Sequence, residues 1–194
     1  MKSIGNRLSE KYISKGIIEP QFKDAYAYIF DYFFSYAVYN VSLLFLGVLI
    51  NRPLTAMVYI IMTGSIRAIS GGYHCKTRIS CSILSYAVFA LYLFFTKNVL
   101  LLSTHILLFI YIINWILILI ISPVDTPNKP FNPAQKQKAQ KRIFSFFIFN
   151  SIFSVFTRLF HWDKGLYFIN LSLIICVAGL YAGYFSNRRQ QLEP

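Results

Sequence analysis

The sequence has few charged residues, and very few of them are acidic. Only 13% of the 194 residues are charged, about half the share found in a soluble domain, and seven Asp and Glu stand against nineteen Lys and Arg. Because 56% of the residues are hydrophobic, a soluble fold of this length would have too little interior to bury them. This composition excludes ordinary soluble enzymes and disordered tails, and it predicts an integral membrane protein.

The sequence is also poor in cysteine, with only Cys75, Cys81 and Cys176. An odd number, with none in an expected outer loop, argues against a framework of structural disulfides. Residues 1–24 lack both a compact apolar stretch and a small-residue cleavage site, so we expect no signal peptide.

Six apolar runs approach the length that a bilayer core demands, which is about 20 helical residues. They cover residues 26–50, 54–69, 81–95, 99–121, 143–160 and 166–185. The second and third runs are short. We therefore predict an all-α integral membrane protein with six transmembrane helices, two of which are short and flank a Gly-Gly-x-His loop.

The positive charges predict how these helices are oriented. Fifteen of the nineteen Lys and Arg lie in the segments 2–23, 67–78, 129–142 and 188–189, which alternate with the six runs so that all four fall on one side. Because cytoplasmic segments are enriched in Lys and Arg, we expect a multi-pass membrane protein with both termini in the cytoplasm.

We expect a single membrane domain over residues 1–194. Within residues 1–24, apolar residues recur near helical spacing at Ile4, Leu8, Ile13, Ile17 and Ile18, which predicts an amphipathic helix on the cytoplasmic leaflet. A solvated basic lead-in is the alternative. Residues 26–185 form the six-span bundle, and residues 186–194 are a cytoplasmic tail. Residues 122–142, with four prolines and five bases, are expected to form an extended basic cytoplasmic loop and then a short polar helix.

The segment between the two short runs holds a base and a nucleophile, His74 and Cys81. On one continuous helix they would be about 10.5 Å apart along the axis, too far for proton transfer. The helix must therefore break between them, and Gly71-Gly72 provides the conformational freedom. Ser80, or alternatively Thr77, would cap the next helix and place Cys81 in or near its first turn, where the helix dipole favours a thiolate.

Plainer interpretations exist for the same residues. A thiol in a membrane helix is usually a packing residue, and a loop histidine is often a surface group. Zinc binding by His74, Cys75 and Cys81 is a weaker alternative, because no second Cys or His pair has the spacing of a metal site. Cys75 is a rival nucleophile. We expect Asp31, in the first run, to pair with a nearby Lys or Arg rather than act as a third catalytic group.

The motif as a whole resembles the signature of a known family. It reads Arg67-x3-Gly71-Gly72-x-His74-x6-Cys81-x3-Ser85, and a proline-rich basic loop, Pro123-x-Asp125-x-Pro127-x2-Pro130, follows the fourth run. Together with chain length and span number, these features resemble the accessory gene regulator B proteins, bacterial membrane endopeptidases that process quorum-sensing propeptides. The resemblance implies that His74 and Cys81 are the catalytic pair and that Arg67 and Gly72 support activity.

The resemblance also implies a substrate: a propeptide with an amphipathic N-terminal helix, a central signal segment containing Cys or Ser, and an acidic tail. A basic cytoplasmic face would attract such a tail, and Lys129, Lys136 and Lys138 are candidates to bind it. Arg67 and a backbone N–H near Gly72 are oxyanion candidates, and Ser85 could orient the site. We expect no cofactor, no metal and no nucleic acid; lipids and a homodimer are further expected partners. A small peptide exporter without proteolytic activity is the main alternative function, and a scaffold protein is another.

The substrate hypothesis predicts what lies beside this gene. We expect a short neighbouring reading frame that encodes an amphipathic start, a central Cys or Ser and an acidic end, because such a peptide complements the basic face. Reading the genomic neighbourhood checks this, and a neighbourhood without any such frame would count against the peptidase hypothesis.

Overall fold

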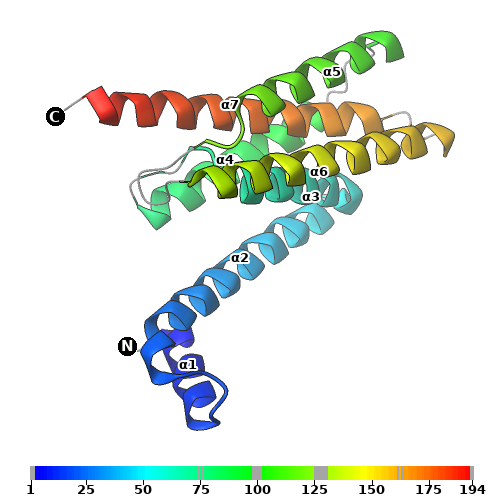
Figure 1. Cartoon of the computed structure of the whole chain (residues 1–194). Helices are drawn as coiled ribbons and strands as arrows, with labels where there is room; N and C mark the ends of the chain where they lie inside the picture. The colour runs from blue at the N-terminus through cyan, green and yellow to red at the C-terminus, as the bar shows by residue number, and fades with distance from the viewer. Residues whose placement is uncertain are drawn as a thin grey trace. The chain divides into compact units, whose positions relative to one another are not determined.

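The computed structural model describes residues 3–73, 75, 77–97, 102–124, 131–160, 162 and 164–192. Within them the chain forms seven α helices and one short 3-10 helix, with no strand, which confirms the all-α prediction (Figure 1). The elements are α1 (Ile4–Ser14), η1 (Pro20–Phe22), α2 (Lys23–Leu49), α3 (Pro53–Ser70), α4 (Arg78–Lys97), α5 (Thr104–Ile121), α6 (Pro133–Leu159) and α7 (Gly165–Leu192). They fall into two compact units, divided after Ile50, which we describe separately.

The first unit is a helical pair in which α1 packs against α2. Gly5 lies so close to α2 that a Cβ there would overlap the carbonyl oxygen of Ala27. The Gly5 N–H donates to Oδ1 of Asp31 over 2.8 Å, so this carboxylate binds one of the unpaired donors at the start of α1. Lys23 and Glu10 form a salt bridge of 2.8 Å between the two helices. The predicted amphipathic segment is therefore helical up to Ser14, and Ile17 and Ile18 lie beyond the helix.

The second unit is a bundle in which α7 is the central helix. It packs against α3, α4, α5 and α6, and it has the highest buried share of the helices apolar enough to span a membrane. Ile169, Leu173 and Leu180 of α7 are almost fully buried, as are Ile66 of α3 and Trp115 of α5. These side chains belong to one apolar cluster that joins four of the five helices.

Three polar side chains form a buried link inside this cluster. The Tyr111 hydroxyl of α5 donates to Oδ1 of Asn150 over 2.9 Å and also lies 3.0 Å from the hydroxyl of Ser151. Nδ2 of Asn150 in α6 contacts the sulfur of Met62 in α3 at 2.7 Å. Because Asn150 is fully buried, these contacts satisfy a side chain that would otherwise be costly in an apolar core.

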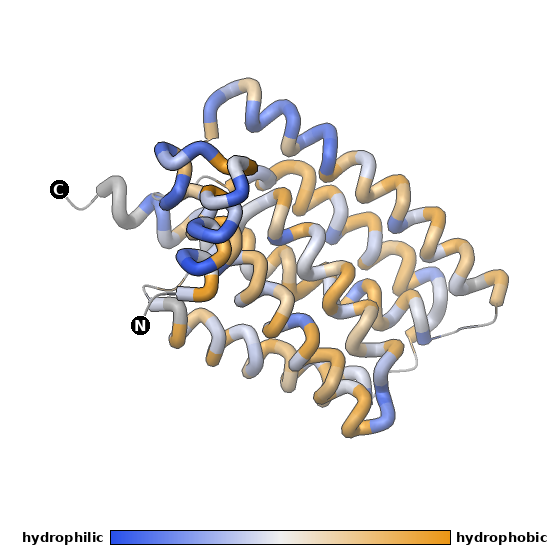
Figure 2. Tube along the Cα trace, turned by 90° about the horizontal axis from the view of Figure 1, so that it is seen from below, coloured by the Kyte–Doolittle hydropathy of each residue, from blue (hydrophilic) through white to orange (hydrophobic). Residues whose placement is uncertain are grey.

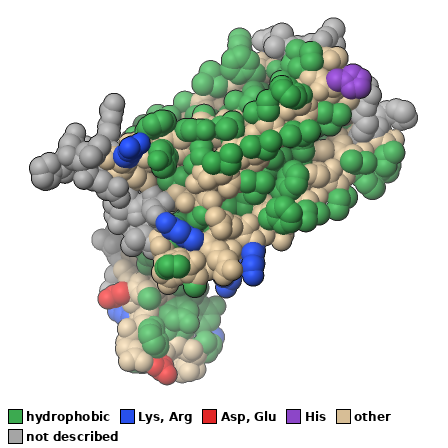
Figure 3. Space-filling view, turned by 45° about the horizontal axis from the view of Figure 1, so that its top comes forward, with side chains coloured by type: hydrophobic (Ala, Val, Ile, Leu, Met, Phe, Trp, Pro, Cys, Tyr) green, Lys and Arg blue, Asp and Glu red, His purple; other side chains and the backbone are tan. Residues whose placement is uncertain are grey.

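Within the described residues, five helices are apolar and long enough to cross a membrane: α2 with η1, α3, α4, α5 and most of α7. Hydrophobic side chains cover most of the face of the second unit shown in Figure 3, and Lys and Arg gather toward one end of it. The chain is thus a multi-pass membrane protein by composition. The first turns of α6 are hydrophilic (Figure 2), and its apolar part, from Ile143, is close to the lower limit of about 17 residues. A sixth span, and the side on which the termini lie, remain predictions.

Some predicted boundaries were wrong. The fourth run was predicted from residue 99, but α5 begins at Thr104, because the Ser103 side chain accepts the N–H of Ile106 and starts the helix there. The polar segment before the fifth run is not a separate short helix. It is continuous with α6, which starts with reciprocal bonds between Asn132 and Gln135. The helix α7 extends through most of the predicted tail, to Leu192.

The buried link predicts a measurable contribution to stability. Asn150→Ala removes the contacts to Tyr111 and Met62, so we expect the free energy of unfolding to fall by about 1 to 2 kcal/mol. Detergent-titrated unfolding of the purified protein measures this. Ser145→Ala is the matched control on α6, because the Ser145 hydroxyl is exposed and bonds only to its own helix at Lys141. Equal stability of the two variants would contradict the prediction.

Candidate functional site

The helix break that the His74–Cys81 spacing requires is present in the described residues. The helix α3 ends at Ser70, where Gly71 adopts a φ of +75° and donates its N–H to the carbonyl of Arg67. The next helix, α4, begins only at Arg78. The described residues between α3 and α4 are therefore not helical, and no continuous helix leads from α3 to Cys81. His74 itself lies outside the described residues.

Thr77 starts the second of these helices. Its Oγ1 accepts the N–H of Ser80 over 3.2 Å, and its carbonyl accepts the N–H of Cys81 over 3.1 Å. Thr77 is thus the N-cap, and Ser80 is not, because the Ser80 hydroxyl turns back to the Thr77 carbonyl. Cys81 lies in the first turn of α4 and is partly buried. A helical Cα–Cβ bond tilts toward the N-terminus, which directs the thiol toward the preceding non-helical segment.

The backbone from Gly71 to Tyr73 lies directly on α7. The Tyr73 N–H donates to the carbonyl of Gly179 over 3.0 Å. A Cβ on Gly183, one turn further along α7, would come within 2.5 Å of the Gly72 carbonyl carbon and 2.7 Å of the Tyr73 nitrogen. Gly72 has a φ of +129°, which only glycine adopts without strain. Gly183 thus allows a close approach of backbone to backbone.

The segment that follows α5 also contacts this stretch of backbone. Val124, which follows α5, donates its N–H to the carbonyl of Ser70 over 2.9 Å. A Cβ on Gly71 would lie 2.8 Å from the Val124 carbonyl oxygen. The start of the predicted basic loop therefore contacts the end of α3, just before the predicted catalytic histidine in sequence.

The Arg67 side chain bonds to the backbone of the segment that follows α3. Its Nη2 donates to the carbonyl of Tyr73 over 3.0 Å, while the side chain as a whole remains exposed. The guanidinium has five N–H donors, so this bond leaves donors for a further acceptor. The Arg67 side chain thus binds the backbone of the segment that follows α3.

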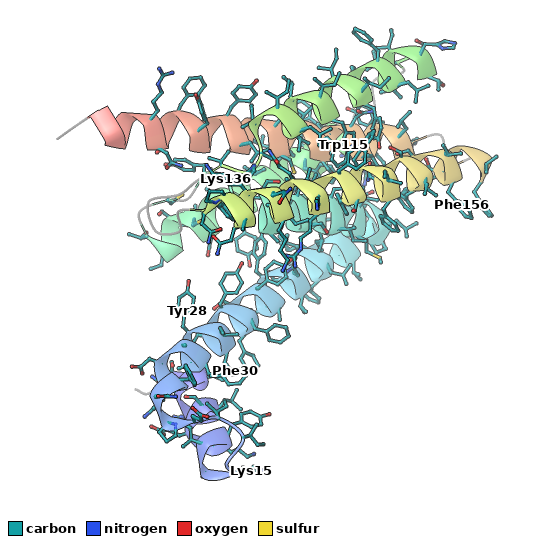
Figure 4. The ribbon with its side chains drawn as sticks, viewed as in Figure 1. Lys15, Tyr28, Phe30, Trp115, Lys136 and Phe156 are labelled. Carbon is teal, nitrogen blue, oxygen red and sulfur yellow. The ribbon has the colours of Figure 1, made fainter. Side chains whose placement is uncertain are left out.

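The other predicted residues are dispersed around this point. Ser85 is partly buried one turn after Cys81 on α4, and Cys75 is partly buried in the non-helical segment. Lys136 and Lys138 lie in the first turns of α6, partly buried and exposed respectively, and Lys136 is at the end of the bundle where α4 begins (Figure 4). Lys129 lies outside the described residues. Sequence reasoning missed Gly179 and Gly183, although their i, i+4 spacing in an apolar helix was a readable signal.

A sizeable cleft lies elsewhere in the second unit. A cleft of about 510 Å³ lies between α5, α6 and the start of α7, and its lining includes Leu108, Trp115, Phe147 and Ser154 but no Cys, His, Asp or Glu. It holds none of the predicted residues that the structure describes. Across the described part of the chain, no three His, Cys, Asp or Glu side chains gather where they could hold a metal ion.

Comparison with known proteins gives one family. A sequence model of the family described as accessory gene regulator B matches residues 2–184. The chain is 26% identical to a "Putative AgrB-like protein" of Clostridium perfringens (strain SM101 / Type A), over 71% of this chain and 69% of that protein. It is 26% identical to "Putative AgrB-like protein 2" of Clostridium perfringens (strain 13 / Type A), over 59% of this chain and 58% of that protein. No solved structure matches the chain.

The burial of the three thiols predicts different reactivities. Cys75 and Cys81 are partly exposed, whereas Cys176 of α7 is only 2% exposed. In variants that keep one cysteine each, we expect N-ethylmaleimide to modify Cys75 and Cys81 in the folded protein about 100-fold faster than Cys176, which requires local opening. Mass spectrometry over time measures the rates, with denatured protein as the control. A Cys176 rate equal to that of Cys81 would contradict the prediction that Cys176 is buried in the folded protein.

Proposed function

Because the chain belongs to the accessory gene regulator B family, we propose that it is a membrane cysteine endopeptidase that removes the C-terminal tail of a quorum-sensing propeptide. His74 and Cys81 are the proposed catalytic pair. The observation that supports this best is the helix break: α3 ends at Ser70, and α4 starts so that Cys81 lies in its first turn, partly exposed. A nucleophile at a helix N-terminus beside an irregular segment is a typical arrangement for a reactive thiol.

In the first step, His74 takes the proton of Cys81, and the sulfur attacks the carbonyl carbon at the C-terminal end of the signal segment. The tetrahedral intermediate collapses when the C–N bond breaks. His74 returns the proton to the leaving amine, so the acidic tail leaves as a free peptide. The signal segment remains on Cys81 as an acyl-enzyme thioester.

In the second step, a thiol or hydroxyl within the signal segment attacks the thioester carbonyl. A thiol gives a macrocyclic thiolactone and a hydroxyl gives a lactone, and either reaction releases Cys81 as the free thiol. Exchange of one thioester for another is nearly thermoneutral, so cyclisation needs no further energy source. Exclusion of water near the thioester would favour ring closure over hydrolysis.

Polar groups around the break are suited to supporting roles. Arg67, which still has N–H donors beyond its bond to Tyr73, and the backbone N–H near Gly72 are the proposed donors to the oxyanion. Ser85 lies one turn from Cys81 on the same helix face and is proposed to orient the thiol or the substrate.

Positive charge near the site supports an acidic ligand. Lys136 and Lys138 lie in the first turns of α6, and Lys141 and Arg142 are exposed on the following turn. We propose that three lysines, Lys129, Lys136 and Lys138, attract the acidic tail and hold it while the peptide bond before the tail is cleaved. The amphipathic start of the propeptide would bind the membrane surface.

The proposal predicts the behaviour of three variants. Membranes containing Cys81→Ala or His74→Ala should lose at least about 1,000-fold of tail release, because nucleophile and base act as a unit. Cys75→Ser should retain activity within about threefold, because the neighbouring thiol has no role in the reaction. Peptide mass spectrometry with the propeptide from the neighbouring reading frame measures cleavage, and a hydroxylamine-sensitive adduct on Cys81 reports the thioester.

The same experiment distinguishes the peptidase from the alternative function, a peptide exporter without proteolytic activity. A peptide exporter would tolerate Cys81→Ala and still move an already cyclised peptide across the membrane. Tail release that persists in Cys81→Ala, with equal amounts of protein in the membrane, would refute the peptidase proposal.

A further inference from the structure

Residue 73 is held by two different helices immediately before the proposed catalytic histidine. Its N–H donates to the carbonyl of Gly179 in α7 over 3.0 Å, and its carbonyl accepts from Nη2 of Arg67 in α3 over 3.0 Å. The carbonyl belongs to the peptide bond that links Tyr73 to His74. The peptide backbone at Tyr73, directly before His74 in the sequence, is therefore held by α7 and Arg67 together.

The surface of α7 that receives this backbone has no side chain at the critical position. Gly183 is buried, and a Cβ there would come within 2.5 to 2.9 Å of three backbone atoms of Gly72 and Tyr73. Because these are backbone atoms, a rotamer change cannot relieve the overlap, and the segment itself would have to move. Gly179, one turn earlier, has no atom of the described residues within 4 Å of where its Cβ would be. Only one of the two glycines is thus required by the close approach.

The segment cannot easily give way in the opposite direction. Gly71 lies against the carbonyl of Val124, where an added Cβ would be 2.8 Å from the oxygen, and the Val124 N–H is bonded to Ser70. Residues 70 and 71 are therefore held by the segment after α5, and residues 72 and 73 are held by α7. A displacement at Gly183 would act on Gly72 and Tyr73, which directly precede His74 in the sequence.

We propose that Gly183 is a positioning residue of the peptidase: because it has no side chain, it leaves a seat on α7 for the backbone of Gly72 and Tyr73, and this seat sets where the chain enters the catalytic segment before His74. This inference rests on the proposed function. Gly183 acts through the backbone of Gly72 and Tyr73 and not through a contact with substrate, so it should govern the chemical step rather than binding. A misplacement of about 1 Å in a catalytic group can reduce a rate by up to about 100-fold.

Gly183→Ala and Gly179→Ala are a matched pair for the test, because both add one methyl group and raise the helix propensity of α7 equally. We expect Gly183→Ala to lower kcat for tail release by about 10- to 100-fold, with KM for the propeptide changed less than about threefold. Gly179→Ala should retain kcat within about twofold. Acyl-enzyme formation in a single turnover should slow in parallel with kcat.

A second measurement uses the unaltered protein and does not depend on how the variants fold. In hydrogen exchange of the full-length protein in lipid nanodiscs, the amide of Tyr73 should be protected at least about 10-fold relative to an open loop, because it is bonded to Gly179. Protection there, together with a selective loss of kcat in Gly183→Ala, supports the proposal. An unprotected Tyr73 amide overturns it, as does Gly183→Ala with the same kcat as Gly179→Ala.

Cys81→Ala separates this inference from the function on which it rests. If Cys81→Ala still releases the tail, the peptidase proposal fails. If Cys81→Ala is inactive and the two glycine variants are equally active, only the seat on α7 is refuted. A Gly183→Ala effect seen as loss of protein from the membrane, without a change in kcat of the remaining protein, would assign Gly183 a structural role and also refute it.

Discussion

A polypeptide that stops being helical within or beside a bilayer must satisfy its backbone polar groups from other parts of the protein, because hydrocarbon supplies no partners. Residues 70–73, where α3 ends, make three such bonds. The Gly71 N–H binds the Arg67 carbonyl, the Ser70 carbonyl accepts from Val124, and the Tyr73 N–H binds Gly179. The break that separates the proposed base from the proposed nucleophile is thus stabilised by three other parts of the fold. Close contact between bare backbones at glycines is what brings the donors and acceptors within reach.

The same device is used in the first unit, on a smaller scale. Gly5 permits α1 to touch the backbone of α2 at Ala27, and the Asp31 carboxylate accepts the Gly5 N–H. A carboxylate within a predicted span first suggested an interfacial ion pair or a catalytic role. Its bond to an unpaired donor at a helix start explains part of its presence in structural terms. The acidic side chain therefore needs no role in the proposed reaction.

Much of this arrangement follows from local sequence, and the remainder depends on contacts that local sequence does not contain. The apolar runs, the helix break between His74 and Cys81, and the position of Cys81 at a helix start were predicted from length, spacing and capping residues. Hydropathy placed the start of the fourth run too early. The helix α5 begins at Thr104, because the Ser103 side chain caps it there. The choice between Thr77 and Ser80 depended on which hydroxyl turned back. The contact of Gly72 with Gly183 joins residues more than a hundred positions apart, so no local pattern could specify it.

The bond between Val124 and Ser70 has a consequence for how relatives of this protein could diversify. Val124 lies near the start of the proline-rich basic loop, and its backbone contacts the end of α3 at Ser70 and Gly71. A chimaera that exchanges this stretch to change peptide preference would therefore have to place its junction after Val124. A junction only a few residues earlier would also exchange Val124 and its contact with Ser70. A change in peptide preference could then not be told apart from a change in the backbone beside the proposed catalytic segment.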